Sequence, residues 1–211
     1  GTIGAIGVFS FDFAKTITTG EGGMVITNDE TFFLRARGYQ DHGHDQNPHF
    51  PRGKDTHDSW GLNFRMMEIQ GALGIAQLKK LDSIIENQKN NKQKIKNGLK
   101  QNIALQWREL PDEEGDSADA LIFFVESEDV ASKIAAMAAS AGVGTKNLPD
   151  ALNWHFAETW DHMLSQVPYY KNKRLIEVFK PSSDILHRAI ALPIYVNMSD
   201  EDINKVIHTV S

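Results

Sequence analysis

The chain has 211 residues and a mass of 23.6 kDa, which is enough for one large domain or two small ones. Apolar residues make up 41% and charged residues 24%, so a disordered or fibrous chain is excluded. The net charge of −6 argues against nucleic acid and anionic lipid as main partners. The absence of cysteine excludes disulfides and thiolate metal sites and is compatible with the cytoplasm. The apolar runs are too short to span a bilayer.

The first third of the chain predicts two strands, a helix and a long loop. Residues 5–13 are rich in β-forming side chains and predict a buried strand. Residues 24–27 predict a second strand, joined to the first by a Gly-rich turn. Asp29 is a typical helix cap, so we expect a helix through about Tyr39. Residues 40–60 are rich in His, Asp, Pro and Gly and predict a loop.

The middle of the chain changes to helical periodicity from Met66 onward. An apolar stripe with helical spacing runs through Ile69, Leu73, Ala76, Leu78, Leu81 and Ile85. The pattern predicts either one long helix or two helices broken near Asp82 and Ser83. The stripe fades into polar sequence by about Asn97, as in a helix that leaves one domain and leads into the next.

The second half alternates between strand and helix patterns, which predicts a small α/β sandwich. Ser199 with Asp202 resembles a capping box at the start of a final helix. The predicted strands are 103–110, 120–125, 143–148 and 189–196, and the predicted helices are 127–141, 154–164 and parts of 169–180.

The densest group of chemically useful residues lies at 9–23, around a single lysine, Lys15. Burial beside apolar groups lowers the pKa of a lysine, and a neutral amine can form a Schiff base with a carbonyl. Ser10 and three threonines could donate hydrogen bonds to a phosphate; the threonines are Thr16, Thr18 and Thr19. The alternative is a plain strand–turn–strand unit whose lysine extends to the surface.

This segment resembles the active-site segment of the DegT/DnrJ/EryC1/StrS sugar aminotransferases, which use pyridoxal 5′-phosphate on a fold-type I scaffold. The shared pattern is Ser-Phe, then Lys, then Thr-x-Gly-Glu-Gly-Gly, found here at Ser10–Gly23. A second family signature resembles Gly61-Leu62-Asn63-Phe64-Arg65-Met66, followed by an Ala-rich helix that ends in Gln77-Leu78. Two signatures in the same order are more specific than either alone.

The resemblance implies roles for three residues. Lys15 matches the lysine that binds the cofactor as a Schiff base and later moves the substrate's proton. Ser10 matches the hydroxyl that binds the cofactor phosphate. Asn63 matches a residue that reaches the phosphate of the neighbouring subunit's cofactor, which implies a homodimer with shared active sites. Family members that dehydrate sugars have His in place of this lysine, so Lys15 favours amino transfer.

Three short segments, at 41–45, 115–118 and 153–155, suggest the substrate. They resemble segments of family members that transfer an amino group from glutamate to the 8-aldehyde of an octulosonate sugar for lipopolysaccharide. The implied substrate is 8-oxo-3,8-dideoxy-manno-octulosonate. The alternative is a nucleotide-linked 3- or 4-keto-6-deoxy sugar.

Five residues are candidates for contact with the sugar: His42, His44, Arg65, Trp154 and His155. Imidazole groups suit hydroxyl-rich, anionic sugars, and Arg65 could pair with a carboxylate in a bidentate manner. Each residue has a structural alternative: a solvated loop for the histidines, an ion pair for Arg65, and core packing for Trp154 and His155. His42-x-His44 could bind a metal, but no cysteine supports it, so we expect no physiological metal site.

We expect residues 1–85 to be the end of the large cofactor domain and residues 86–211 the small α/β domain. Family members carry a preceding half that supplies further parts of the cofactor site. The chain begins at Gly1 without methionine or signal peptide, so we expect it to be part of a longer protein. Three rival hypotheses remain: a sugar dehydratase, a non-catalytic fragment that dimerises or binds sugar, and a metal-binding loop protein.

Overall fold

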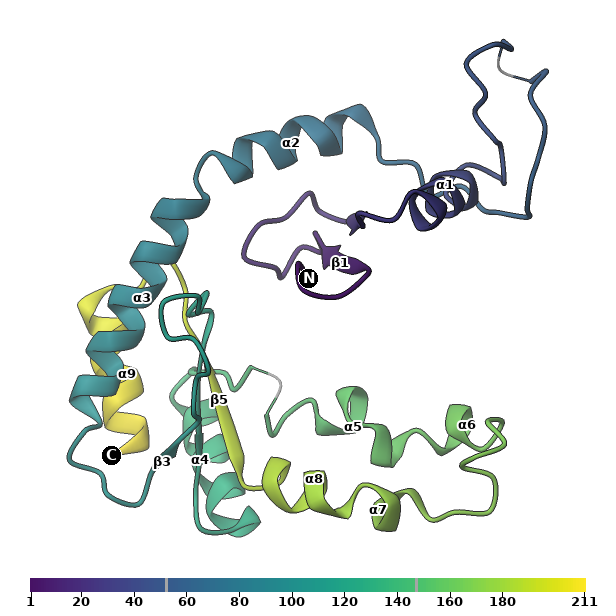
Figure 1. The fold of residues 1–211 in the computed structure, drawn as a ribbon. Helices are drawn as coiled ribbons and strands as arrows, with labels where there is room; N and C mark the ends of the chain where they lie inside the picture. Colours follow the sequence, from purple (N-terminus) through teal and green to yellow (C-terminus); the bar gives the residue numbers. More distant parts are fainter. Residues whose placement is uncertain (52, 147) are drawn as a thin grey trace. The chain divides into compact units, whose positions relative to one another are not determined.

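The computed structural model describes residues 1–51, 53–146 and 148–211 (Figure 1). The chain divides into two compact units, Gly1–Asp82 and Ser83–Ser211. No helix within the described ranges is both long enough and apolar enough to cross a membrane.

The first unit is built around a two-stranded antiparallel sheet of β1 (Gly7–Ser10) and β2 (Gly23–Ile26). Two helices follow, α1 (Glu30–Tyr39) and α2 (Glu68–Leu78). Asp29 caps α1, since its Oδ1 accepts a hydrogen bond of 3.1 Å from the backbone N–H of Phe32. The predicted hairpin, the predicted cap and the helix end at Tyr39 are confirmed.

The predicted burial of the first strand is wrong for this chain. Of the four residues of β1 only Gly7 is buried, while Val8 is 73% exposed. A two-stranded sheet has two open faces unless other elements cover them, and α2 likewise has no buried residue. The apolar sequence of this strand is typical of a buried strand. In the described part of this chain, however, no other element covers it.

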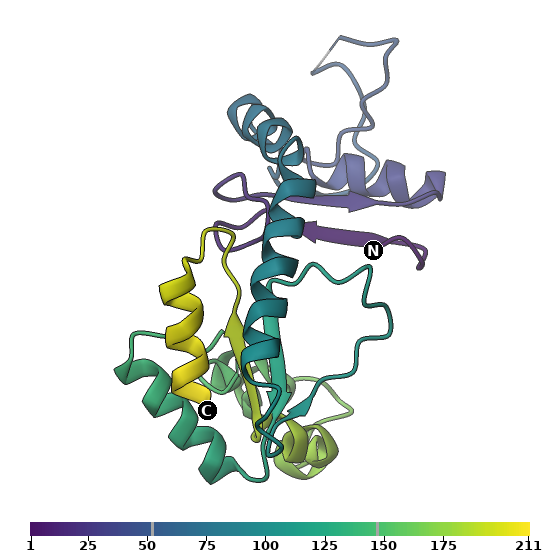
Figure 2. The same ribbon diagram turned by 90° about the vertical axis from the view of Figure 1, so that its left-hand side faces the viewer.

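The second unit contains a three-stranded antiparallel sheet in the order β3-β4-β5. The strands are β3 (Gln106–Trp107), β4 (Ala120–Phe124) and β5 (Ala189–Pro193). Three helices lie against this sheet: α3 (Leu81–Gly98), α4 (Glu128–Ser140) and α9 (Asp200–Val210). Figure 2 shows α9 beside both α3 and α4, with the sheet behind them.

One apolar cluster joins these elements into a core. Ile95 of α3, Phe123 of β4 and Ile190 of β5 are each 0% exposed and belong to the same cluster as Val206 of α9. Alternate residues of β4 face this cluster, as expected for a strand with one face packed on helices. The predicted α/β sandwich is therefore confirmed.

Several element boundaries differ from the sequence prediction. The helix break lies at residues 79–80, because α2 ends at Leu78 and α3 begins at Leu81. The predicted strand 103–110 shrinks to two residues. Residues 143–148 form no strand among those described, although Lys146 and Leu148 exchange backbone hydrogen bonds with Ala191 of β5; residue 147 lies outside the described residues.

Short helices rather than long ones occupy residues 152–186. Isolated helices of one or two turns depend on tertiary contacts, which explains why periodicity predicted them poorly. They are α5 (Leu152–His155), η1 (Ala157–Thr159), α6 (Asp161–Leu164), α7 (Leu175–Val178) and α8 (Lys180–Leu186).

The capping box of α9 provides a stability prediction. The Ser199 side chain accepts from the Asp202 backbone N–H at 3.1 Å, and the Asp202 carboxylate accepts from the Ser199 N–H at 2.8 Å. Ser199→Ala should lower the free energy of unfolding by about 1 kcal/mol in urea denaturation. Ser182→Ala is the matched control, because Ser182 is an exposed serine in α8. Equal effects of the two substitutions would contradict the capping role.

The Lys146–Asp119 ion pair predicts a pH dependence of stability. Burial on its own would raise the pKa of the Asp119 carboxyl, but the Lys146 ammonium and the Ser117 hydroxyl hold that pKa below its ordinary value. The pair therefore stabilises the fold above about pH 4 and loses this contribution as the pH falls through the folded-state pKa.

Both partners are partly exposed, so the contribution should be at most about 1 kcal/mol. Urea denaturation at pH 7 and pH 3 should show a smaller loss of stability for Asp119→Asn than for the wild type. An unchanged pH dependence in the variant would contradict the assignment.

Candidate active site

The connection between β1 and β2 holds Lys15 in a loop with many internal hydrogen bonds. The Phe11 carbonyl accepts from the Thr19 backbone N–H at 3.0 Å and from the Thr18 hydroxyl at 3.1 Å. The Thr19 hydroxyl donates to the Glu21 carbonyl at 2.6 Å, and the same carbonyl accepts from Gln70 of α2. Thr18 and Thr19 therefore hold the loop together, and the prediction that they donate to a phosphate is not supported by these contacts.

Lys15 lies exposed near the middle of this loop, so the expected burial of its side chain is wrong for this chain. No described carboxylate forms an ion pair with its ammonium. The Ser10 hydroxyl accepts from the Asp12 backbone N–H at 3.3 Å, which leaves its own proton free to donate. An amine and the hydroxyls of Ser10 and Thr16 on one loop suit a ligand with a carbonyl and a phosphate. This donor set fits pyridoxal 5′-phosphate.

The second candidate region is the loop after α1, whose two ends are paired through the backbone. The His42 N–H donates to the Leu62 carbonyl at 3.0 Å, and the Leu62 N–H donates to the Tyr39 carbonyl at 2.9 Å. Asp41 and Asn63 form a β-bridge, so the predicted cofactor residue Asn63 lies opposite the start of the loop. Apart from residue 52, which lies outside the described residues, the predicted loop at 40–60 is confirmed.

Asn63 and Arg65 lie two residues apart on the same segment of this pairing. The Asn63 Oδ1 accepts from the Arg65 backbone N–H at 3.4 Å, so its amide N–H groups remain as donors. Arg65 forms an ion pair with Asp41 through Nη1 and Oδ1. The structural alternative for Arg65, an ion pair, is therefore present in the fold, and the Arg65 side chain is 37% exposed.

His44 is held by a second carboxylate, Asp55. The His44 Nδ1 lies 3.1 Å and 3.0 Å from the two Asp55 oxygens, and the centroid of the His57 ring lies 4.2 Å from that of His44, with the rings tilted by 40°. Burial would raise the pKa of the Asp55 carboxyl, but the hydrogen bond and charge of His44 and the Gly53 N–H hold it below its ordinary value. Sequence analysis missed Asp55, because a partner eleven residues away leaves no periodic signal.

Asp41, His42 and His44 offer ligand atoms that all lie within 4.8 Å of one another, which is a geometry that could hold a metal ion. The Arg65 guanidinium is bound to the same Asp41 carboxylate. A cation beside this carboxylate opposes the binding of a second one, so charge disfavours a metal here. The cluster is better suited to present Arg65 and the imidazoles to an anion.

Trp154 and His155 lie in the second unit, on α5, and form a group of their own. Trp154 is 79% exposed, and its backbone carbonyl accepts from the Trp160 indole N–H at 3.1 Å. The two rings are 6.5 Å apart in an edge-on arrangement. The core-packing alternative for Trp154 is wrong, since its ring is open to solvent.

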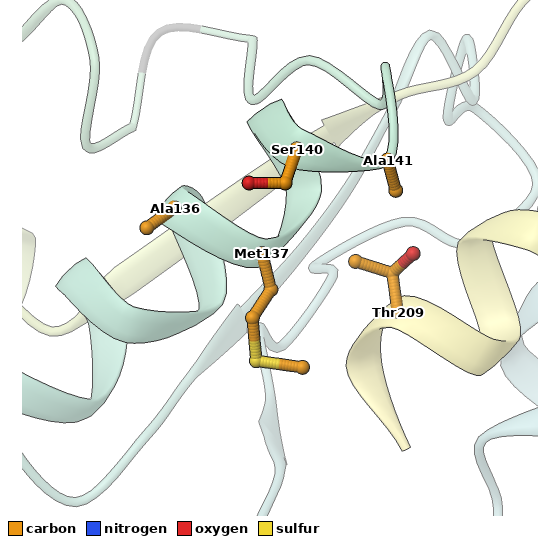
Figure 3. Close-up of a pocket in the computed structure, with 5 residues that line it drawn as sticks. All are labelled: Ala136, Met137, Ser140, Ala141 and Thr209. Carbon is orange, nitrogen blue, oxygen red and sulfur yellow. The ribbon is translucent and has the colours of Figure 1, made fainter.

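Among the pockets of the described residues, one lies in the second unit and another lies beside the Lys15 loop. One, of about 510 Å³, lies between α4 and α9 and is lined by Ala136, Met137, Ser140, Ala141 and Thr209 (Figure 3). The other, of about 230 Å³, lies between the Lys15 loop and α2 and is almost wholly apolar. Neither is lined by a titratable side chain, so neither suits a charged sugar.

Comparison with known proteins assigns the family. The model of the DegT/DnrJ/EryC1/StrS aminotransferase family matches residues 1–211. The chain belongs to this family. The aminotransferase TlmJ from Streptoalloteichus hindustanus covers 100% of the chain with a TM-score of 0.76 at 22% identity, and the match spans 52% of its own length. The fold is therefore that of the fold-type I sugar aminotransferases.

Two curated relatives match parts of the chain. GDP-perosamine synthase from Escherichia coli O157:H7 is 42% identical over 103 residues, which is 49% of this chain and 26% of the relative. GDP-4-keto-6-deoxy-D-mannose 3-dehydratase from Yersinia pseudotuberculosis is 40% identical over 103 residues, 43% of this chain and 26% of the relative. The chain thus spans about half of the solved relative, and the matches cover about a quarter of each curated one.

Gly43 makes the loop pairing possible and provides a test of it. Its φ is +86°, and a Cβ atom here would lie 1.7 Å from the Ser59 carbonyl oxygen. Gly43→Ala should therefore separate the two ends of the loop, and hydrogen exchange of the His42 amide should lose protection. Gly53→Ala is the control, because Gly53 has a φ of +88° and a Cβ atom added there would meet no described atom within 4 Å. It should cost only backbone strain, about 1–2 kcal/mol, and leave the His42 amide protected.

Proposed function

We propose that this chain is part of a pyridoxal 5′-phosphate-dependent enzyme that transfers an amino group from glutamate to a keto or aldehyde sugar. The observation that carries this proposal is Lys15, which lies exposed on a loop rich in hydroxyl groups, at the position that matches the family's cofactor lysine. Family membership over residues 1–211 supports it. The chain spans about half the length of the solved relative, so the activity belongs to the whole protein.

Three residues would hold the cofactor. Lys15 would bind it through its side-chain amine, the Ser10 hydroxyl would donate to the phosphate, and the Asn63 amide would donate to the phosphate at a neighbouring subunit. When bound, pyridoxal 5′-phosphate supplies an electron sink that stabilises negative charge on the substrate carbon. In this proposal the protein is a homodimer with shared active sites, and its location is the cytoplasm, as the cysteine-free composition allows.

Lys15 also moves a proton in the proposed reaction. Its Nζ atom takes a proton from the amino-bearing carbon of glutamate, and it delivers a proton to the sugar carbon in the second half-reaction. The Lys15 side chain is exposed and pairs with no described carboxylate, so it is accessible to the reacting groups. Lysine at position 15 favours amino transfer over the dehydration named for the Yersinia relative.

The sugar is the finer part of the proposal. The segments around Asp41, Gly115 and Asn153 favour 8-oxo-3,8-dideoxy-manno-octulosonate and a role in lipopolysaccharide synthesis. The name of the Escherichia coli relative favours instead a nucleotide-linked keto-6-deoxy sugar. Candidate contacts to either sugar are His42, His44, Arg65, Trp154 and His155. We further propose that residues 1–85 end the large domain and that residues 86–211 form the small one.

The lysine assignment is tested on the full-length protein by adding pyridoxal 5′-phosphate, reducing with borohydride and mapping the labelled peptide. Lys15 should carry the label, and Lys15→Arg should lose both the label and about 10³-fold or more of the activity. Lys133→Arg, at an exposed lysine of α4, should keep both.

Labelling elsewhere, or unchanged turnover of Lys15→Arg, would overturn the proposed function. Turnover assays with glutamate and each of the two sugar classes then decide the substrate. If only the isolated chain fails to take up label, the rival hypothesis of a non-catalytic fragment holds for the chain alone.

A further inference from the structure

We propose that Asp41 is a positioning residue that orients Arg65 to bind an anionic group of the sugar substrate. This inference rests on the proposed function, and it adds a residue that touches neither the sugar nor the cofactor. The anion is a carboxylate in a sugar acid or a phosphate in a nucleotide-linked sugar, and both suit the planar guanidinium group.

The two partners differ in exposure. The Asp41 side chain is 10% exposed, whereas the Arg65 side chain is 37% exposed. The contact uses only the Nη1 atom of Arg65 among the described contacts of its side chain, and a guanidinium carries five N–H donors. The less exposed carboxylate therefore binds one N–H group of the arginine, while its other N–H groups remain available to a ligand from solvent.

Asp41 is itself held in place by further donors. Its Oδ2 accepts from the Gln46 amide at 3.3 Å, and the Gln46 Oε1 in turn accepts from Arg37 of α1. Its Oδ1 lies 3.3 Å from the Nδ1 of His42. A buried carboxylate with donors on both oxygens has little freedom to rotate. Arg65 is thus anchored to a fixed group rather than to a mobile surface carboxylate.

The backbone keeps Asp41 and Arg65 in register. Asp41 forms the β-bridge with Asn63, and the Phe64 N–H donates to the Gln40 carbonyl at 2.9 Å. The ion pair thus links residues on two paired segments, one on each side of the loop. Fixing an arginine in advance removes the entropy that it would otherwise lose on binding. The negative charge of Asp41 by itself weakens the attraction of Arg65 for an anion. The benefit of the pair is therefore the smaller loss of entropy when the anion binds.

Arg65 reactivity tests the pairing without any enzyme assay. In the full-length protein, phenylglyoxal modifies accessible guanidinium groups, and peptide mapping by mass spectrometry gives the rate at Arg65. Asp41→Asn should raise that rate about 5-fold or more, because the ion pair is lost. Asp45→Asn is the matched control, since Asp45 lies in the same loop and bonds Thr56 and the Asn47 N–H instead. Equal rates in the wild type and both variants would overturn the inference.

A double-mutant cycle then tests whether the pairing serves the substrate. Asp41→Asn should raise the KM for the sugar about 10–100-fold and change kcat by less than about 3-fold. In an Arg65→Gln background the same substitution should have no further effect, whereas a general folding defect would add to it. Full additivity would overturn the positioning role.

Asp41→Glu keeps the negative charge, so its KM for the sugar should lie between those of the wild type and Asp41→Asn. This variant also provides the test if Asp41→Asn fails to fold. Assays with a sugar acid and with a nucleotide-linked sugar distinguish a carboxylate from a phosphate as the bound anion. If the wild type aminates no sugar while the Arg65 labelling rate still responds to Asp41, the proposed function fails and the pairing stands.

Discussion

The organisation of the first unit depends on one buried carboxylate, that of Asp41. Removing a charge from water is costly unless hydrogen bonds and an opposite charge replace the water. Here the replacements come from His42 beside it, Gln46 within the loop and Arg65 beyond the loop. Since Arg65 is 24 residues from Asp41 in the sequence, this ion pair forms only when the two ends of the loop come together. The pairing of the loop ends positions Asn63 opposite Asp41 and brings Arg65 to the Asp41 carboxylate.

The Lys15 loop follows a different principle. Its shape comes from neutral bonds between hydroxyls and backbone carbonyls, at Thr18 and Thr19. No described carboxylate pairs with Lys15, so the hydrogen bonds that shape the loop do not engage the amine. The amine therefore stays available for the proposed Schiff base with the cofactor.

The two units differ in how they bury apolar surface. The second unit has a core in which Phe123, Ile95 and Ile190 are fully buried between sheet and helices. The first unit leaves large side chains exposed, among them Trp60 and Ile69 at 74% each. Extended apolar surface of this kind is typical of a face that other polypeptide covers. The half-length match to the solved relative and the proposed homodimer agree with this feature.

Local chemistry in the sequence was enough to predict the hairpin, the Asp29 and Ser199 caps, and strands β4 and β5. The caps depend on neighbours within a few residues, and the strands show as runs of β-forming residues, so the local sequence predicts both. The two family signatures likewise singled out Lys15, Asn63 and Arg65 as candidates for the site. Only the tertiary structure showed that Asp41 forms an ion pair with Arg65, that Asp55 pairs with His44, and that β1 is exposed. The two ion pairs join residues far apart in sequence, and the exposure of β1 depends on which surfaces the fold covers. Neither kind of feature leaves a periodic pattern in the sequence.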